Sequence, residues 1–422
     1  MHWIQKLKLI LKDPDLRNKI LFILFILLLF RVGAAIPIPG VDHARLQEFF
    51  AGNQFFGLLN LFSGGTLDNL SIMMLGVAPY ITGSIIMQLL TMIFPALKAM
   101  YQEEGEAGRQ KFNQYSRYLT VPLAAIQGFG ILTLLGRQGV LGELSLFASA
   151  FNIIIVVAGS VLLMWLGELI SEKGIGNGIS ILIFAGIVAG IPSAVSQVFF
   201  SFDSSMIPLI AGFVAVAIVI VAGTVFITEG QRPIPISYAK RIRGMRVYGG
   251  VSTYLPIRVN QAGVIPIIFA LSILLFPQMI VNFFAGSGSP LVQGISNALL
   301  IFLNTSWVYA LLYFIFVFAF TYFYTAVTFD PESIATNLQK QGAFVPGIRP
   351  GPPTASFLYK IINRITLIGA IFLGLIAVLP LLMQIITGIV ALTIGGTGLL
   401  IVVSVVLETI KQIDAQLVMR EY

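Results

Sequence analysis

The sequence contains no cysteine and only two histidines, His2 and His43. Disulfides and thiolate metal sites are therefore excluded. Both histidines lie outside the long apolar runs, which excludes a histidine proton relay within those runs. No Walker lysine, HExxH motif or serine nucleophile elbow occurs. Nothing in the sequence indicates catalytic residues, a metal site or a cofactor.

Charged residues make up only 10% of the chain, whereas 57% are hydrophobic and the mean hydropathy is +0.93. Apolar runs long enough to cross a bilayer, which takes about 20 helical residues, recur along the whole sequence. We therefore predict an all-α polytopic membrane protein. Its ten transmembrane helices are expected at residues 18–36, 71–95, 118–136, 151–170, 179–198, 206–228, 263–285, 306–328, 363–382 and 392–411.

The positive charges predict the orientation, because short loops rich in lysine and arginine stay in the cytoplasm. With the N-terminus inside, all but three of the 25 basic residues are cytoplasmic; Arg45 and Arg137 lie outside, and Arg31 lies within the first span. Five spans precede an external hinge loop at 199–205 and five follow it. Because an odd number of spans reverses direction, we expect two inverted five-helix halves, residues 18–198 and 206–411.

The two ends of the chain are expected on the cytoplasmic side. Residues 1–17 interleave lysines with apolar residues at helical spacing, which predicts an amphipathic helix on the inner leaflet. The alternative for residues 1–36 is a signal peptide. Residues 412–422 are expected to form a cytoplasmic tail. Arg31 either snorkels outward, pairs with a helix C-terminus or faces a water-filled cavity. Of these three environments we favour the water-filled cavity.

Two long cytoplasmic loops are predicted. Residues 229–262 contain KRIRGMR (240–246) and then β-prone residues around Gly249 and Gly250, which predicts a hairpin with a two-residue turn. Residues 329–362 contain GAFVPGIRPGPP, a tip that presents Arg349. The loops are either solvated connectors or a basic surface for lipid headgroups, ribosomal RNA or an acidic protein.

One apolar run is too short to span. FFGLLNLF (55–62) is followed at once by Ser63, Gly64 and Gly65. As a helix it would be only about 12 Å long, whereas the apolar core of a bilayer is about 30 Å thick. On length alone it is an interfacial or re-entrant piece packed against protein.

Several motifs resemble those of one family. They are IPIPG (36–40), LFSGGTL (61–67), EGEAGRQKFNQYSRY (104–118), MWLGELISEKGIGNGISILIFAGIVAG (164–190), YAKR (238–241), VNQAGVIPIIF (259–269), GAFVPGIRPG (342–351) and IGGTGLLIVV (394–403). In matching order and over nearly the whole chain, this pattern resembles the SecY family of protein-conducting channels, in its bacterial form.

The resemblance implies a passive pore between the two halves, which passes unfolded polypeptides and releases transmembrane segments sideways into lipid. Spacing alone does not separate a pore lining from a lipid-facing or core stripe. By motif, the aliphatic ring that narrows the pore corresponds to Val77, Ile81, Ile183, Ile187, Ile268 and Ile401. Val77 is one methylene smaller than isoleucine, so we expect a slightly looser seal there.

The short apolar run corresponds to the family's plug, residues 55–67, with Gly64 and Gly65 as a hinge. Its central residues are Leu58, Leu59, Asn60, Leu61, Phe62, Ser63, Gly64 and Gly65.

Two further sites follow from the resemblance. A lateral gate between the second and third spans and the seventh and eighth places Gln88, Gln127 and Asn260 at a polar seam. The alternatives are that the two glutamines serve internal packing and that Asn260 lies in the cytoplasmic loop. The motor ATPase SecA and the ribosome dock on the cytoplasmic loops, through Arg349, Lys240, Arg241, Arg243 and Arg246. The small subunits SecE and SecG and a bacterial plasma membrane location are implied as well.

Two other classes fit the composition less well. A secondary transporter also has inverted halves, but it usually keeps an ionisable residue near the midplane. None of the 18 acidic residues lies in the middle of a predicted span. A membrane-embedded enzyme would need paired polar catalytic groups at depth, and the sequence contains none.

Overall fold

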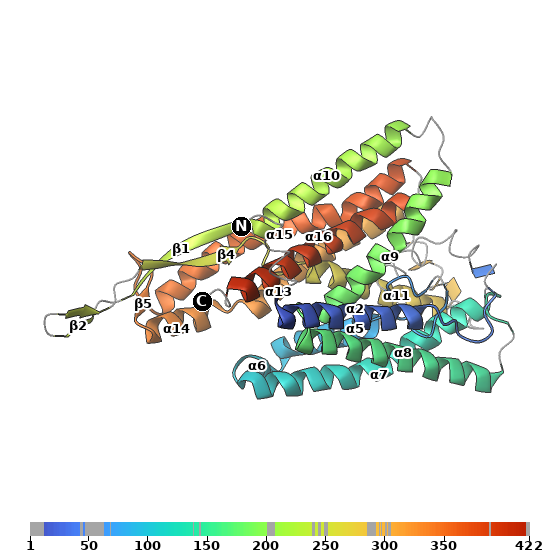
Figure 1. Cartoon of the computed structure of the whole chain (residues 1–422), viewed down its shortest axis with the longest axis horizontal. Coiled ribbons are helices and arrows are strands. Elements are labelled where there is room, and N and C mark those ends of the chain that lie inside the picture. Colours follow the sequence, from blue (N-terminus) through green and yellow to red (C-terminus); the bar gives the residue numbers. More distant parts are fainter. Residues whose placement is uncertain are drawn as a thin grey trace.

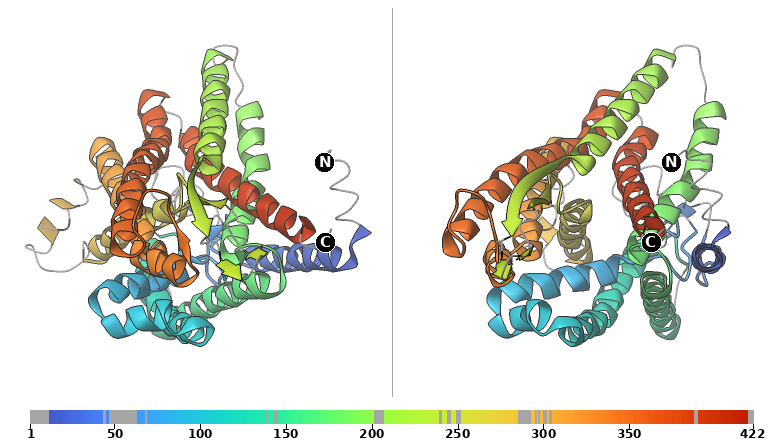
Figure 2. Two further views of the ribbon diagram at one scale, coloured as in Figure 1. Left: turned by 90° about the vertical axis from the view of Figure 1, so that its left-hand side faces the viewer. Right: turned by 60° about the vertical axis from the view of Figure 1, so that its left-hand side comes forward.

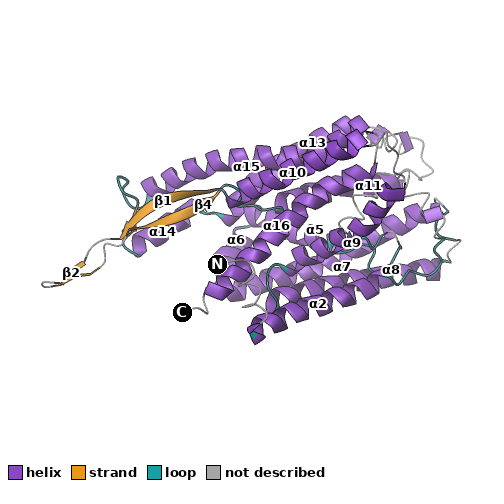
Figure 3. Cartoon of the chain, turned by 45° about the horizontal axis from the view of Figure 1, so that its top comes forward, coloured by secondary structure: helices purple, strands orange, loops and turns teal. Residues whose placement is uncertain are grey.

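The protein is a long helical bundle with a small β-structure at one end (Figures 1 and 3). This computed structural model describes residues 12–42, 45–46, 63–67, 69–137, 139–142, 145–200, 207–238, 241–243, 246–248, 252–284, 293–294, 296, 298–299, 302, 305–387 and 390–418. Each predicted span coincides with a helix in this part of the chain. These helices are α2 (Pro14–Ala34), α5 (Ala78–Ile93), α7 (Gly105–Arg137), α8 (Leu146–Lys173), α9 (Gly178–Phe200), α10 (Ile207–Glu229), α11 (Ile265–Phe284), α13 (Ser306–Thr328), α15 (Pro352–Thr387) and α16 (Val390–Val418).

Several helix boundaries differ from the prediction. α2 begins at Pro14, inside the expected interfacial segment, because the Asp13 side chain accepts a hydrogen bond from the Asp15 N–H and Pro14 suits the first helical turn. Residues 1–11 lie outside the described part. α5 begins only at Ala78, seven residues later than hydropathy indicated, because residues 71–77 form turns. α15 begins at Pro352, inside the expected loop 329–362.

The second predicted span bends sharply at its C-terminal end. α5 meets the short helix α6 (Pro95–Gln102) at an angle of 114°. The residue before a proline disfavours helical geometry, so α5 ends before Phe94 and α6 starts at Pro95. By length and composition, five helices in the described residues can cross a membrane, and this bent pair makes a sixth candidate.

The helices form two groups, which are joined mainly through α9, α11 and α16. In the first group α2 packs on α8, α5 on α7, α7 on α8 and α8 on α9. In the second, α13 and α16 pack on α15, α11 on α13 and α10 on α16. The main contacts between the groups join α9 to α16, and α11 to α5 and α7. Figure 2 shows α5, α7 and α8 (cyan to green) on the opposite side of the molecule from α10 and α15.

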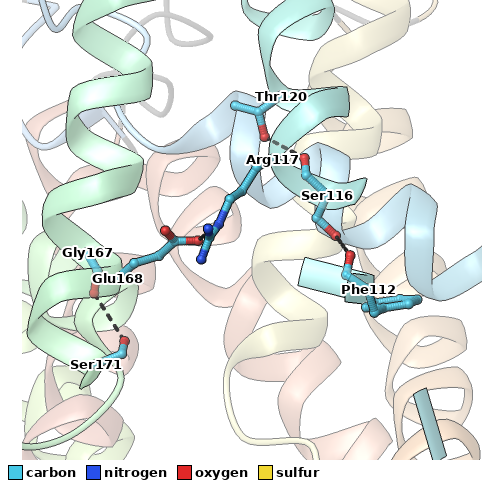
Figure 4. A network of polar contacts seen from close by, with 7 residues as sticks. All are labelled: Phe112, Ser116, Arg117, Thr120, Gly167, Glu168 and Ser171. Atoms are coloured by element: carbon cyan, nitrogen blue, oxygen red, sulfur yellow. Dashed lines mark hydrogen bonds and ion pairs between the residues drawn. The ribbon is translucent and has the colours of Figure 1, made fainter. Parts of the chain in front are cut away.

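Polar and small residues tie the first group together. The Arg117 guanidinium on α7 donates to the Glu168 carboxylate on α8 at 2.6 Å (Figure 4). A Cβ on Gly83 of α5 would lie 3.2 Å from the carbonyl oxygen of Ser116 on α7, so the glycine lets these two helices approach closely.

A β-structure extends from the same end of the bundle as α6 and the helix α14 (Pro331–Lys340), as Figure 1 shows. Strand β1 (Gln231–Tyr238) pairs with β4 (Ser252–Arg258) on one side and β5 (Ala343–Phe344) on the other, all antiparallel. Apolar residues of this sheet pack with the start of α15 in one cluster, which includes Ile234, Ile257, Val345, Leu358 and Ile361. The two predicted cytoplasmic loops therefore form one folded unit.

The predicted hairpin around Gly249 and Gly250 is wrong. The strand before these glycines, β3 (Arg246–Tyr248), pairs with β2 (Arg241–Arg243), and the strand after them, β4, pairs with β1. The local sequence on both sides of the glycines is β-prone, but β4 has a seven-residue partner in β1 that buries Ile234, Ile236 and Ile257. The longer, half-buried pairing is the more stable one.

Candidate pore and its surroundings

The six residues expected to form the ring are all buried and belong to one apolar cluster. Their exposed fractions run from 2% to 7%, and the cluster holds Val77, Ile81, Ile183, Ile187, Ile268 and Ile401 together. Ile85, one turn beyond Ile81, lies in the same cluster at 2% exposure. None of the six is a lipid-facing side chain of the bundle.

The elements that carry these residues are those that join the two helix groups. Val77 caps the N-terminus of α5, and Ile81 lies in its first turn. Ile183 and Ile187 lie on α9, Ile268 on α11 and Ile401 on α16. Since α9 contacts α16 and α11 contacts α5, the six side chains lie where the groups meet. The spacing of apolar residues within one helix does not show which residues of the other three helices they contact.

The chain on both sides of the predicted plug is held by backbone hydrogen bonds. The Ile38 N–H donates to the Leu70 carbonyl and the Ile72 N–H donates to the Ile36 carbonyl, both at 2.9 Å. The Thr66 hydroxyl donates to the carbonyls of Ser63 and Met73, at 2.9 and 2.8 Å. Residues 55–62 of the predicted plug (55–67) lie outside the described residues.

The turn near the C-terminal end of the predicted plug needs glycine. Gly64 and Gly65 have φ angles of +80° and +77°, in the left-handed region that glycine adopts without strain. The role of these two glycines as a hinge for the plug stays a prediction. Ser63, next to them, is 3% exposed.

Arg31 has partners that sequence reasoning did not foresee. Its guanidinium donates to the carbonyls of Ala185 at 2.9 Å, Gly186 at 3.4 Å and Gly64 at 3.4 Å. The expected environments were the membrane surface, a helix C-terminus and a water-filled cavity. The guanidinium contacts backbone from the middle of α9 and from the turn at Gly64, and the water-filled cavity that we favoured stays a prediction.

Of the three residues assigned to a lateral gate, Gln88 lies on α5, Gln127 on α7 and Asn260 before the start of α11. Two of them bond locally. The Gln88 amide donates to Ser84 on its own helix at 3.3 Å, and the Asn260 amide donates to the Gly263 carbonyl at 3.2 Å. Their carbonyl oxygens are buried and have no hydrogen-bond partner among the described residues. Gln127 on α7 is 7% exposed.

Arg349 is exposed on a turn with defined supports. Its carbonyl accepts a hydrogen bond from the Thr354 hydroxyl at 2.8 Å, and the Ile348 N–H donates to the Val345 carbonyl at 3.0 Å. Gly347 and Gly351 have φ angles of +84° and +96°. Arg241, Arg243 and Arg246 lie in β2 and β3, whereas Lys240 lies outside the described residues.

Comparison with known proteins decides the family. A model of the SecY family matches residues 71–410. The chain is 45% identical to the protein translocase subunit SecY of Streptomyces galbus over 435 residues, which cover 97% of each chain. The chain belongs to the SecY family. Members are multi-pass membrane proteins, and the chain is a translocase channel subunit, a passive pore rather than an enzyme.

Solved SecY and Sec61 channels share the fold. One is a SecY protein whose plug domain stabilises the closed state of the translocation channel and maintains a membrane seal; its TM-score is 0.64, with 20% identity over 93% of this chain and 91% of that one. Another is Sec61 in the canine ribosome-channel complex from the endoplasmic reticulum, with a TM-score of 0.59 and 19% identity over 93% and 91%. The likeness confirms the all-α SecY fold.

Proposed function

We propose that Val77, Ile81, Ile183, Ile187, Ile268 and Ile401 form the constriction through which unfolded polypeptides cross the bacterial plasma membrane. The observation that carries this proposal is their burial in one apolar cluster, on the helices that join the two groups. The segment 55–67 acts as the plug on the outer side of the constriction.

An aliphatic constriction suits a channel that must accept every side chain. Walls with charges or hydrogen-bonding groups would hold some segments of the moving chain more tightly than others, whereas apolar walls bind none of them strongly. A narrow apolar passage also tends to dewet, which raises the barrier to ions. Movement through such a passive pore is driven by a partner motor or by the ribosome.

Transmembrane segments leave sideways through a seam formed by α5 and α7 on one side and α11 and α13 on the other. Support comes from the α11 contacts with α5 and α7 and from the two buried carbonyl oxygens of Gln88 and Asn260. Hydrogen bonds between helices in a bilayer contribute only about 0.6 to 2 kcal/mol each. An apolar helix entering from the pore can therefore separate the helices at this seam, where Gln88, Gln127 and Asn260 are the polar side chains.

The β-structure, α14 and the turn at Arg349 form the cytoplasmic docking surface for SecA and the ribosome, and both chain termini lie on that side. Support comes from the concentration of positive charge in the two predicted cytoplasmic loops, with Lys240, Arg241, Arg243 and Arg246 in the first loop and Arg349 in the second. Positive charge suits ribosomal RNA phosphates without base recognition. The small subunits SecE and SecG complete the complex.

Ion conductance of the purified channel in planar bilayers tests the constriction. We expect Ile187→Gly and Ile401→Asn to raise the closed-state leak about tenfold, which corresponds to about 1.4 kcal/mol less stabilisation of the closed state. Ile218→Gly is the matched control, because Ile218 on α10 is 63% exposed. An unchanged leak in both ring variants, or an equal rise in the control, would count against the assignment.

A further inference from the structure

Arg31 joins two parts of the chain that are far apart in the sequence. Its guanidinium on α2 donates to the carbonyl of Gly64 at 3.4 Å, and to those of Ala185 and Gly186 on α9 at 2.9 and 3.4 Å. A guanidinium presents several N–H donors in a fixed plane, so one side chain can bond two segments at once.

The two segments that Arg31 joins also touch directly. A Cβ on Gly186 would lie 2.1 Å from the Cα of Gly64, and a Cβ on Gly64 would lie 2.7 Å from the ring of Phe30. Both distances are shorter than atoms tolerate, so glycine is needed at both positions. The turn at Gly64 therefore lies with its backbone against the backbone of α9.

This contact lies beside the proposed constriction. Gly186 lies on α9 between Ile183 and Ile187, and both isoleucines share an apolar cluster with Phe30. Arg31 is half-buried at the edge of that cluster. A charged side chain inside a bilayer protein is unfavourable unless it has polar partners, and here its partners are three carbonyl groups.

We propose that Arg31 is a positioning residue that holds the turn at residues 63–65 against α9 when the channel is closed. The inference rests on the proposed function and adds a residue to it that is neither in the ring nor in the predicted plug. Hydrogen bonds from a charged donor are stronger than neutral ones. A polypeptide that enters the pore and displaces the turn has to break these hydrogen bonds. When no polypeptide is present, the same bonds keep the channel closed.

Labelling of a single cysteine tests the position of the turn directly. The chain has no cysteine of its own, and Ser63, next to Gly64, is 3% exposed. We expect Arg31→Gln to raise the rate at which Ser63→Cys reacts with a membrane-impermeant maleimide by about tenfold, which corresponds to about 1.4 kcal/mol. Ser160→Cys, at 1% exposure on α8, should stay protected in the same variant and show that the bundle remains folded.

Closed-channel conductance provides the second measurement. Gly186→Ala forces the turn away from α9 with the arginine still present, so we expect it to leak as Arg31→Gln does. Gly190→Ala is the matched control, since a Cβ there meets nothing within 4 Å. Its leak should equal that of the unmodified channel.

The outcomes separate this inference from the proposed constriction. If Arg31→Gln leaves both labelling and leak unchanged while Ile187→Gly leaks, the positioning role is wrong and the constriction stands. If Arg31→Gln exposes Ser63→Cys and leaks while Ile187→Gly does not leak, the positioning role stands and the constriction is wrong. Exposure of Ser160→Cys together with Ser63→Cys would show general unfolding and would also overturn the positioning role.

Discussion

At the scale of single residues, the close contacts of the first helix group depend on glycine. A Cβ on Gly159 of α8 would lie 2.0 Å from the carbonyl oxygen of Ile72, and one on Gly178 of α9 would lie 1.9 Å from that of Gly167. Next to Gly159, the Ser160 hydroxyl donates to the Gly76 carbonyl at 2.9 Å. Small residues let backbones approach in membrane proteins, and a hydroxyl can satisfy a carbonyl outside a helix.

Gly159→Ala should therefore destabilise the protein by about 1 to 3 kcal/mol, the usual effect of overpacking a core. The added methyl group would push the turns at residues 71–77 away from α8 and lower the apparent melting temperature in detergent. Gly212→Ala is the control, because a Cβ there meets nothing within 4 Å. Equal melting temperatures for the two variants would show that the close contact with Ile72 does not matter.

Single residues also show where sequence reasoning stops. Arg31 stands out in the sequence because it is charged within an apolar run, and that signal was sufficient to mark it as unusual. Its partner Ala185 is 154 positions away, and no local pattern connects the two. Gln88 and Asn260 were predicted at a seam, but the hydrogen bonds that they donate are to Ser84 and Gly263, which follow from local backbone geometry.

At the scale of elements, hydropathy predicted the existence of the helices well and their ends less well. Transmembrane helices must satisfy their backbone groups internally, so an apolar run of sufficient length is strong evidence. The start of α5 at Ala78 was missed because residues 71–77 are apolar but form turns that are buried against α8. The hairpin was misplaced because β4 pairs with β1, which precedes β2 and β3 in the sequence, and not with its immediate neighbour β3.

The folded unit built from the two predicted cytoplasmic loops leads to a prediction for docking. Pairing of β1 with β5 and the Thr354 hydrogen bond fix the turn that carries Arg349. Arg349→Glu should lower SecA-dependent export in proteoliposomes at least about tenfold, equivalent to about 1.4 kcal/mol, because it reverses a charge on the preformed turn that we propose as the docking site.

Lys360→Glu is the matched control for this variant. Lys360 is an exposed basic residue on α15, outside the turn, and its reversal changes the net charge by the same amount. Export should then stay close to that of the unmodified channel. Normal export by Arg349→Glu, or an equal loss in both variants, would remove the case for a specific role of the turn.

At the scale of the whole molecule, the two helix groups and the elements that join them explain why the buried aliphatic residues gather in one place. α5, α9, α11 and α16 each contribute to the contact between the groups and each carry at least one of the six residues. Loop charges and the number of spans predict two halves. The side chains that meet between the halves could be proposed only from the family resemblance. Helical periodicity shows which face of a helix is apolar, but it does not show which other helix packs on that face.

The most direct test of the constriction is to identify what its side chains touch during transport. Single cysteines at Val77, Ile81, Ile183, Ile187, Ile268 and Ile401 can be introduced without background, since the chain contains none, and cross-linked to a secretory polypeptide arrested in the channel. A cysteine at Val219, 69% exposed on α10, is the lipid-facing control. The account predicts adducts with the arrested chain at the six positions and none at Val219. Adducts at Val219, or their absence from the six positions, would contradict it.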